Sequence, residues 1–343
     1  MGERPGAVGS RVSVDWRERR VLVTGATGIV GSWLCEELAT RGAYVVALVL
    51  DDDPQSLFYA GGIDRVCSIV RGNLARFEDC LRAINLHECT DIFHLGAQTI
   101  VGNALREPRE TFESNVRGTY NLLEAARCLA GLVQTMVVAS SDKAYGDSPV
   151  LPYTEDMPLV GRHPYDVSKS CTDLITSAYA HTYGTPATIA RCGNIYGGGD
   201  LNWSRIVPGT VRSLLAGERP VLRSDGGPIR DYIYVRDVVD AYIALAEATH
   251  SDIAQPGDAF NFSPQSRYTV LDIVAEIGRL MEVDPNPRIL ATTTMEIRDQ
   301  TLDAGKAKAR LGWQARWSLA DGLAETIDWY REHFATRPEK TGR

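Results

Sequence analysis

The sequence predicts an α/β protein with a doubly wound parallel sheet and a smaller C-terminal α/β lobe. Short apolar, β-branched segments alternate with helical patterns through roughly the first 190 residues, and glycines punctuate the first strand-to-helix turn. Chemically distinctive side chains recur where the expected strands end. Strands that alternate with helices form parallel sheets, and ligands gather at the carboxyl ends of such strands. We therefore expect one site at that edge of the sheet.

The elements can be assigned in chain order. Residues 20–24 form an apolar run without alternation, which is typical of a strand buried on both faces. A helix follows the glycines, with Ile29, Leu34 and Leu38 on its apolar face. We expect further strands at residues 43–50, 66–71, 91–95, 135–140 and 187–191, and helices at 77–86, 111–128, 164–183 and 235–247.

The turn after the first strand carries three glycines spaced G-x-x-G-x-x-G, at Gly25, Gly28 and Gly31. The first allows a tight turn, the second lets backbone approach a pyrophosphate, and the third lets the helix pack close to the strand. The N-terminus of the helix then faces the phosphates. This pattern predicts a Rossmann-type dinucleotide site, to which Thr27, Ile29 and Val30 of the same turn also contribute.

An acidic run follows the second expected strand. Asp51 lies twenty residues beyond Gly31, where a carboxylate holds the ribose hydroxyls of a dinucleotide. A carboxylate there repels a 2′-phosphate, so we expect NAD rather than NADP. Because Asp51, Asp52 and Asp53 are consecutive, the sequence leaves open which of them contacts the ribose.

Tyr165 and Lys169 lie one helical turn apart on one helix face. A phenol has a pKa of ~10, so it is a poor base near neutral pH. A neighbouring ammonium and an oxidised nicotinamide favour the phenolate, and a shift of ~3 units corresponds to about 4 kcal/mol. Tyr165 is therefore a candidate base for a hydroxyl proton while hydride leaves the same carbon. The alternative is a surface helix with a half-buried ring.

The chain has 343 residues, which suggests a large core with an appended lobe. The regular alternation of strands and helices ends at the glycines of residues 197–199, and the strands expected after them are short. We expect disorder at residues 1–18 and 336–343, an NAD-binding domain at 19–192 joined by 232–263, and a substrate-binding lobe at 193–231 and 264–335.

Composition excludes several classes of function. A net charge of −8 argues against a nucleic-acid partner. No apolar run approaches the ~20 residues of a membrane span, and residues 1–16 lack the apolar centre of a signal peptide, so we expect a cytoplasmic protein. The seven cysteines form no C-x-x-C pair, which predicts reduced thiols and no metal site.

Several stretches together resemble a known family. They include VTGATGIVGSWL, HLGAQ, NVRGTYNLLEAAR, SSDKAYG, YDVSKSCTD, RCGNIYGGGD, RDYIYVRDVVDAY and KAKARLGW. Over residues 19–335 the chain is similar to extended short-chain dehydrogenases/reductases of the nucleotide-sugar epimerase/dehydratase group. Within that group it resembles CDP-glucose 4,6-dehydratase-like sequences most and GDP-mannose 4,6-dehydratases next. The resemblance implies tightly bound NAD, a nucleotide-diphosphate hexose substrate and a homodimer through a four-helix bundle formed by residues 111–128 and 164–183.

The resemblance also assigns roles to the residues after the fifth strand. It implies that Ser141 bonds the C4 oxygen of the sugar and that Asp142 is the acid at C6. Lys143 stands where most 4,6-dehydratases have glutamate, but it matches the Asp-Lys form of CDP-glucose dehydratases. For Lys143 (or a water) to remove the C5 proton, the lysine pKa must fall well below ~10.4. The alternative is a solvated Asp142–Lys143 ion pair, which would leave an epimerase or a decarboxylase.

Other positions carry over from the family with less force. Asn73 stands where the family usually has an aspartate that contacts adenine. Its amide oxygen can still accept a hydrogen bond from the exocyclic amine of adenine. Gln98 is either a cofactor or sugar ligand or an ordinary loop amide, and His94 is a strand residue rather than a catalyst. The expected cofactor ligands also include Leu74, Leu95, Gly96 and Ala97, and the expected substrate ligands include Asn194, Arg230 and Arg205.

The function that we predict is a 4,6-dehydratase with an internal redox cycle. Tyr165 takes the C4 hydroxyl proton while NAD takes hydride, and water is lost across C5 and C6. Hydride then returns to C6, so no cofactor is consumed, while Ser141 and Lys169 hold the reacting groups. The alternatives are a 4-epimerase, whose products keep their mass, and a non-catalytic dinucleotide sensor.

Overall fold

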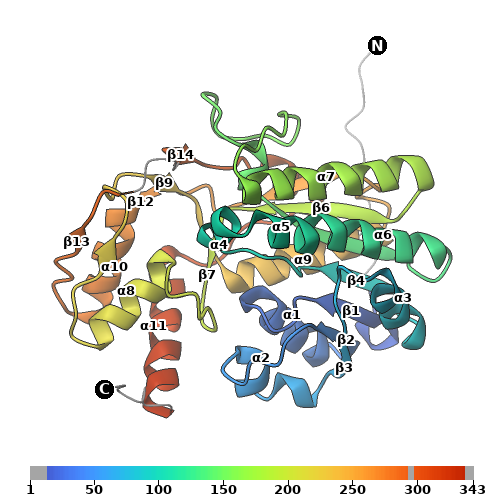
Figure 1. The fold of residues 1–343 in the computed structure, drawn as a ribbon, viewed down its shortest axis with the longest axis horizontal. Coiled ribbons are helices and arrows are strands. Elements are labelled where there is room, and N and C mark those ends of the chain that lie inside the picture. Colours follow the sequence, from blue (N-terminus) through green and yellow to red (C-terminus); the bar gives the residue numbers. More distant parts are fainter. Residues whose placement is uncertain (1–13, 293–296, 337–343) are drawn as a thin grey trace.

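The computed structural model describes residues 14–292 and 297–336. Its centre is a parallel sheet of seven strands in the order β11-β6-β5-β4-β1-β2-β3 (Figure 1). This confirms the predicted Rossmann-type α/β class. The strands are β1 (Arg20–Thr24), β2 (Tyr44–Val49), β3 (Ser68–Arg71), β4 (Asp91–His94), β5 (Thr135–Ser141), β6 (Ala187–Cys192) and β11 (Ala259–Phe262).

Helices cover both faces of the sheet, so the central strands are buried on both sides. In β1, Val21 and Val23 pack into one apolar cluster, whereas Leu22 packs into another. The first cluster includes side chains of α1 (Ile29–Thr40) and α9 (Val235–His250). The second lies under α3 (Phe77–Leu86), α6 (Gly118–Cys128) and α7 (Pro164–Tyr183).

The smaller lobe is built from short strand pairs and three helices beside the carboxyl ends of the large sheet (Figure 1). Its strands pair as β7 with β10, β8 with β13, and β9 with both β12 and β14. The bounds are β7 (Asn194–Tyr196), β8 (Val221–Leu222), β9 (Ile229–Arg230), β10 (Tyr232–Tyr234), β12 (Tyr268–Thr269), β13 (Arg288–Ile289), β14 (Asp299–Gln300), α8 (Ile206–Leu215), α10 (Val270–Met281) and α11 (Leu319–Thr336). The boundaries between the two lobes stay a prediction.

The predicted helix at residues 111–128 is not one regular α-helix. It consists of α5 (Pro108–Phe112), a π-helical turn (Glu113–Arg117) and α6. The remaining short helices are α2 (Leu57–Ala60) and α4 (Val101–Arg106), with 3-10 turns at Trp16–Glu18, Ile63–Arg65 and Asp142–Tyr145 and a π turn at Ala307–Leu311.

The disorder predicted for residues 1–18 is wrong for residues 14–18. The Trp16 ring is buried, lies 6.3 Å from the ring of Phe93, and donates from Nε1 to Glu247 of α9 at 3.0 Å. A buried indole ring whose N–H group donates a hydrogen bond can fix a terminus that is otherwise poor in apolar residues. Residues 1–13 and 337–343 lie outside the described residues, and Thr336 is the last residue of α11.

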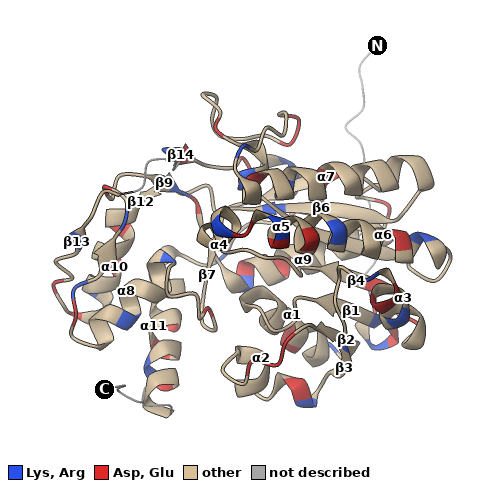
Figure 2. Ribbon diagram, viewed as in Figure 1, with Lys and Arg blue, Asp and Glu red and all other residues tan. Residues whose placement is uncertain are grey.

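Surface composition and thiols can be checked on the described part of the chain. In Figure 2, Lys and Arg are interspersed with Asp and Glu over the outer helices rather than gathered in one basic region. All seven cysteines are free thiols. No described helix combines the length and apolar character needed to cross a membrane. Cytoplasmic location stays a prediction.

Candidate active site

One cavity of about 1470 Å³ lies at the carboxyl ends of the large sheet, between the sheet and the smaller lobe. Parallel strands end at the same edge, so residues far apart in sequence meet there. Asp52 and His94 do not line this cavity, but all the other residues considered for a site role do. They are Gly25, Thr27, Gly28, Ile29, Val30, Gly31, Asp51, Asp53, Asn73, Leu74, Leu95, Gly96, Ala97, Gln98, Ser141, Asp142, Lys143, Tyr165, Lys169, Asn194, Arg205 and Arg230.

The glycine turn packs tightly against neighbouring backbone, which is possible only because side chains are absent at these positions. Gly25 has φ of +68°, and a Cβ there would lie 2.8 Å from the backbone nitrogen of Gly96. A Cβ on Gly31 would lie 2.0 Å from the carbonyl oxygen of Gly25. Gly28 is the N-cap of α1, and the residues of the first turn of this helix line the cavity, where free backbone N–H groups can bind an anion. These features fit the diphosphate of a dinucleotide.

We expect Gly31→Ala to weaken NAD binding by about 10-fold or more, because overpacking at such a contact costs ~1–3 kcal/mol and displaces the turn. Calorimetric titration of NAD measures the change. Gly102→Ala is the control, since a Cβ on Gly102 meets no atom within 4 Å. Equal affinity of Gly31→Ala and the natural protein would contradict the assignment of this turn to the cofactor.

The three consecutive aspartates differ in their hydrogen-bond partners. The Asp52 carboxylate accepts a hydrogen bond from the Tyr59 hydroxyl at 2.5 Å and pairs with Arg71. The Asp53 carboxylate accepts from the Gln55 backbone N–H at 2.9 Å and caps its own turn. Asp51 and Asp53 are both exposed and line the cavity, whereas Asp52 does not line it. Because the Asp53 carboxylate already accepts the hydrogen bond of its own turn, the geometry favours Asp51 for a ribose.

Two predicted cofactor ligands already use their amide oxygens. Asn73 Oδ1 accepts from the Ala75 N–H at 2.8 Å, so its proposed contact to adenine competes with a turn hydrogen bond. Gln98 Oε1 accepts from the Ile100 N–H at 2.6 Å, which favours the loop-amide alternative for that atom. Both side chains nevertheless line the cavity.

His94 behaves as the sequence predicts for a strand residue. It is buried in β4, with Nδ1 2.9 Å from Thr24 Oγ1 and Nε2 3.0 Å from Thr119 Oγ1. Burial, assisted by the Lys169 ammonium, lowers the pKa of His94 to about 3. A neutral ring held at both nitrogens is not a proton carrier at neutral pH.

Asn115, to which the sequence analysis gave no role, fixes the loop that carries Gln98. It lies in the π turn, and its Nδ2 donates to Gln98 O at 3.0 Å and to Ser168 Oγ at 2.9 Å. Its Oδ1 accepts from Gln98 N at 2.7 Å. A π turn inserts one residue and re-aims the side chains beside it, which helical periodicity does not reveal. The only sequence signal was its place at the start of NVRGTYNLLEAAR.

Ser141, Asp142 and Lys143 form a partly buried polar group where β5 ends. Asp142 is only 2% exposed and accepts from the Ser141 hydroxyl at 2.8 Å. Lys143 Nζ lies 3.4 and 3.5 Å from the two carboxylate oxygens of Asp142. The pair is therefore not the solvated one that the alternative requires. Burial lowers the pKa of Lys143 and Arg230 adds to that effect, while the Asp142 carboxylate opposes it.

Tyr165 and Lys169 share the cavity face of α7, as predicted. Burial raises the pKa of Tyr165 to about 12, while the Arg205 guanidinium and the Ser141 hydroxyl act in the opposite direction. Lys169 Nζ donates to Ala139 O at 2.9 Å, and burial lowers the pKa of Lys169 to about 8. The raised pKa of Tyr165 in the protein alone is opposite in direction to the lowered value that the sequence predicts beside Lys169 and an oxidised nicotinamide. That lowering stays a prediction, and it needs a further positive charge near the phenol.

Comparison with known proteins decides the family. The family model described as GDP-mannose 4,6 dehydratase matches residues 22–326. The chain belongs to this family. It is 31% identical to the CDP-glucose 4,6-dehydratase of Salmonella typhimurium over 330 residues, which cover 92% of this chain and 91% of that protein. It is 30% identical to the UDP-glucose 4-epimerase of Mycolicibacterium smegmatis over 324 residues, 91% of this chain and 98% of that protein.

A solved structure of the same group has a similar fold. The dTDP-glucose 4,6-dehydratase DesIV of Streptomyces venezuelae, with NAD and TYD bound, matches with a TM-score of 0.83 and 27% identity over 92% of this chain and 98% of that chain. The resemblance to nucleotide-sugar dehydratases and epimerases of the extended short-chain group is thereby confirmed. The protein is an enzyme of the nucleotide-sugar 4,6-dehydratase family.

The smaller lobe of this dehydratase-family enzyme contributes polar side chains to the cavity. Arg205 pairs with Asp200 at 2.9 Å and donates to Thr99 Oγ1 at 3.3 Å. Arg230 is buried and donates to the carbonyls of Ile229 and Ile297, each at 2.7 Å. Asn194 is half-buried at the start of β7. Within the described residues, no group of three His, Cys, Asp or Glu side chains is arranged to hold a metal ion.

Proposed function

We propose that the protein is an NAD-dependent nucleotide-sugar 4,6-dehydratase that makes a 4-keto-6-deoxyhexose nucleotide. The observation that carries this proposal is the Asp142–Lys143 pair, which is largely withdrawn from solvent beside Ser141 and in the same cavity as Tyr165. A 4-epimerase needs only the hydroxyl and the tyrosine. A dehydratase also needs an acid and a base for C5 and C6.

In this proposal each side chain has one task. Tyr165 takes the C4 hydroxyl proton, and Ser141 holds the C4 oxygen. For the C5 and C6 steps the proton of the Asp142–Lys143 pair has to lie on Asp142, which the burial that lowers the pKa of Lys143 favours. Neutral Lys143 then removes the C5 proton, and Asp142 gives its proton to the departing C6 hydroxyl, which leaves as water. Bound NAD would supply the hydride chemistry at C4 and C6, and the positive charge of its oxidised nicotinamide would favour the phenolate of Tyr165. Lys169 holds the reacting groups in place on the side of the cavity where the cofactor binds.

We infer NAD rather than NADP from Asp51, because a carboxylate at the ribose repels a 2′-phosphate. Tight retention follows if the cofactor is regenerated in each cycle. For the substrate we propose Asn194, Arg205 and Arg230 as ligands of the diphosphate, since guanidinium groups match its oxygens. Arg230 then has to exchange at least one carbonyl partner for phosphate.

The proposed homodimer rests on the helices α5, α6 and α7. Tyr120 and Leu174 are exposed on α6 and α7, as an interface between copies requires. Light scattering coupled to gel filtration tests it directly. A monomeric mass at micromolar concentration would contradict the dimer without affecting the proposed chemistry.

The test of the function is mass spectrometry of CDP-, dTDP-, UDP- and GDP-hexoses incubated with the purified protein without added cofactor. We expect one nucleotide-hexose to lose a single water, which also implies retained NAD. A new chromatographic peak at unchanged mass would instead favour the 4-epimerase, and Asp142 and Lys143 would then be substrate-binding or structural residues.

A further inference from the structure

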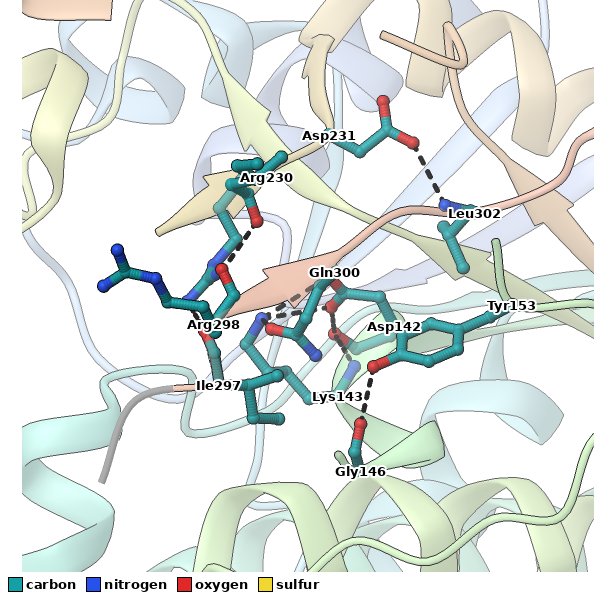
Figure 3. A network of polar contacts seen from close by, with 12 residues as sticks. Asp142, Lys143, Gly146, Tyr153, Arg230, Asp231, Ile297, Arg298, Gln300 and Leu302 are labelled. Carbon is teal, nitrogen blue, oxygen red and sulfur yellow. Dashed lines mark hydrogen bonds and ion pairs between the residues drawn. The ribbon is translucent and has the colours of Figure 1, made fainter. Parts of the chain in front are cut away.

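Gln300 connects the smaller lobe to Lys143. It lies on β14, its side chain is fully buried, and its Oε1 accepts a hydrogen bond from Lys143 Nζ across 157 residues of sequence. Figure 3 shows Gln300, Asp142 and Lys143 converging. The Gln300 Nε2 atom is buried and has no hydrogen-bond partner among the described residues. The amide thus lines the cavity with its oxygen committed to the lysine.

The same strand pair carries the arginine assigned to the substrate diphosphate. β14 pairs with β9 so that Gln300 is in register with Arg230 and Asp299 with Ile229. The two side chains therefore belong to one small structural unit (Figure 3). A movement of this unit that accompanies diphosphate binding would also move the acceptor of Lys143.

The chemistry of an amide suits a lysine that has to lose its proton. An amide oxygen accepts a hydrogen bond from an ammonium or from a neutral amine, so it orients Nζ without requiring the charge. A carboxylate in its place would favour the ammonium. Around Lys143 the charged groups are Asp142 on the same turn, Asp166 on α7 and Arg230 on β9. The nearby Tyr153 hydroxyl donates to Gly146 O at 2.7 Å.

We propose that Gln300 is a positioning residue for Lys143, which it holds toward C5 of the sugar while leaving the lysine free to be neutral. This inference rests on the proposed function for its role in dehydration. The contact itself is a property of the protein alone, so the two can be tested separately.

The first test replaces the amide of Gln300 by a carboxylate, which has the same shape and a negative charge. In Gln300→Glu we expect the pKa of Lys143 to rise by about 1–3 units, because an opposite charge at hydrogen-bond distance favours the ammonium. Trace acetylation with acetic anhydride over a range of pH, read by peptide mass spectrometry, gives the midpoint for Lys143. The rising limb of the pH–rate profile for dehydration should shift to higher pH by the same amount.

The second test removes the acceptor. In Gln300→Leu we expect kcat to fall by about 10- to 100-fold with little change in KM, since the amine is no longer oriented. The labelling midpoint of Lys143 should fall rather than rise. Thr301→Val is the matched control, because Thr301 is the next residue, is also buried, and its hydroxyl has no partner among the described residues.

The outcomes separate the two ideas. An unshifted Lys143 midpoint in folded Gln300→Glu and Gln300→Leu, or the same shifts in Thr301→Val, would overturn the role of Gln300. Absence of dehydration by the natural protein would overturn the proposed function, whereas the labelling midpoints would still report on the Gln300 contact. Circular dichroism verifies folding, and if Gln300→Glu does not fold, Gln300→Leu decides.

Discussion

Tyr165→Phe should reduce turnover by about 10²–10⁴-fold, the usual contribution of a positioned acid or base. Phenylalanine keeps the ring in its half-buried place on α7 but removes the only atom that can take the C4 proton in the proposed mechanism. The loss should fall on kcat, because no diphosphate ligand is changed. Product formation by mass spectrometry, under the conditions that give dehydration by the natural protein, measures it.

The control for this variant is Tyr183→Phe. Tyr183 is on the same helix but is 58% exposed at its C-terminal end. It should retain nearly full activity. If Tyr165→Phe keeps activity within a few-fold of the natural protein, Tyr165 is not the base and the proposed mechanism is wrong.

The sequence predicted six of the seven strands of the large sheet, because these elements have strong local signals, but it did not predict the edge strand β11. The strand at residues 20–24 and the helices at 77–86 and 164–183 have the predicted bounds. Buried parallel strands are continuous apolar runs, and long amphipathic helices repeat regularly. The two-residue strands of the smaller lobe, such as β9 and β14, are too short for any period.

The sequence was enough to predict which residues line the cavity, but not how their side chains are oriented. Strand ends converge in any doubly wound sheet, so residue type and position sufficed to place Asp51 and Tyr165 together. Hydrogen bonds decide where a side chain points, as with Gln98 and Lys169, which bond to nearby backbone. The partner of Lys143, Gln300, is 157 residues away, and nothing in its local sequence indicates the contact.

Removing one partner of the buried Asp173–Arg191 pair should have the largest effect on stability that we can name. Asp173 lies on α7 one turn beyond Lys169, and Arg191 lies near the end of β6. Both are under 5% exposed, and Arg191 donates to the two carboxylate oxygens at 2.7 and 2.8 Å. The guanidinium also donates to the Tyr145 hydroxyl at 2.6 Å. The pair therefore fixes the helix that carries the proposed base against the sheet.

Asp173→Asn should lower the free energy of unfolding by about 3–5 kcal/mol, because it leaves a buried guanidinium without its counter-charge. Urea unfolding followed by circular dichroism measures the shift in midpoint. Asp328→Asn is the control, since its pair with Arg331 on α11 is exposed, and such a change is worth less than about 0.5 kcal/mol. Similar midpoints for the two variants would mean that water or rearranged side chains stabilise the buried charge of Arg191 when Asp173 is replaced. The position of α7, and of Tyr165 with it, would then depend on apolar packing rather than on this pair.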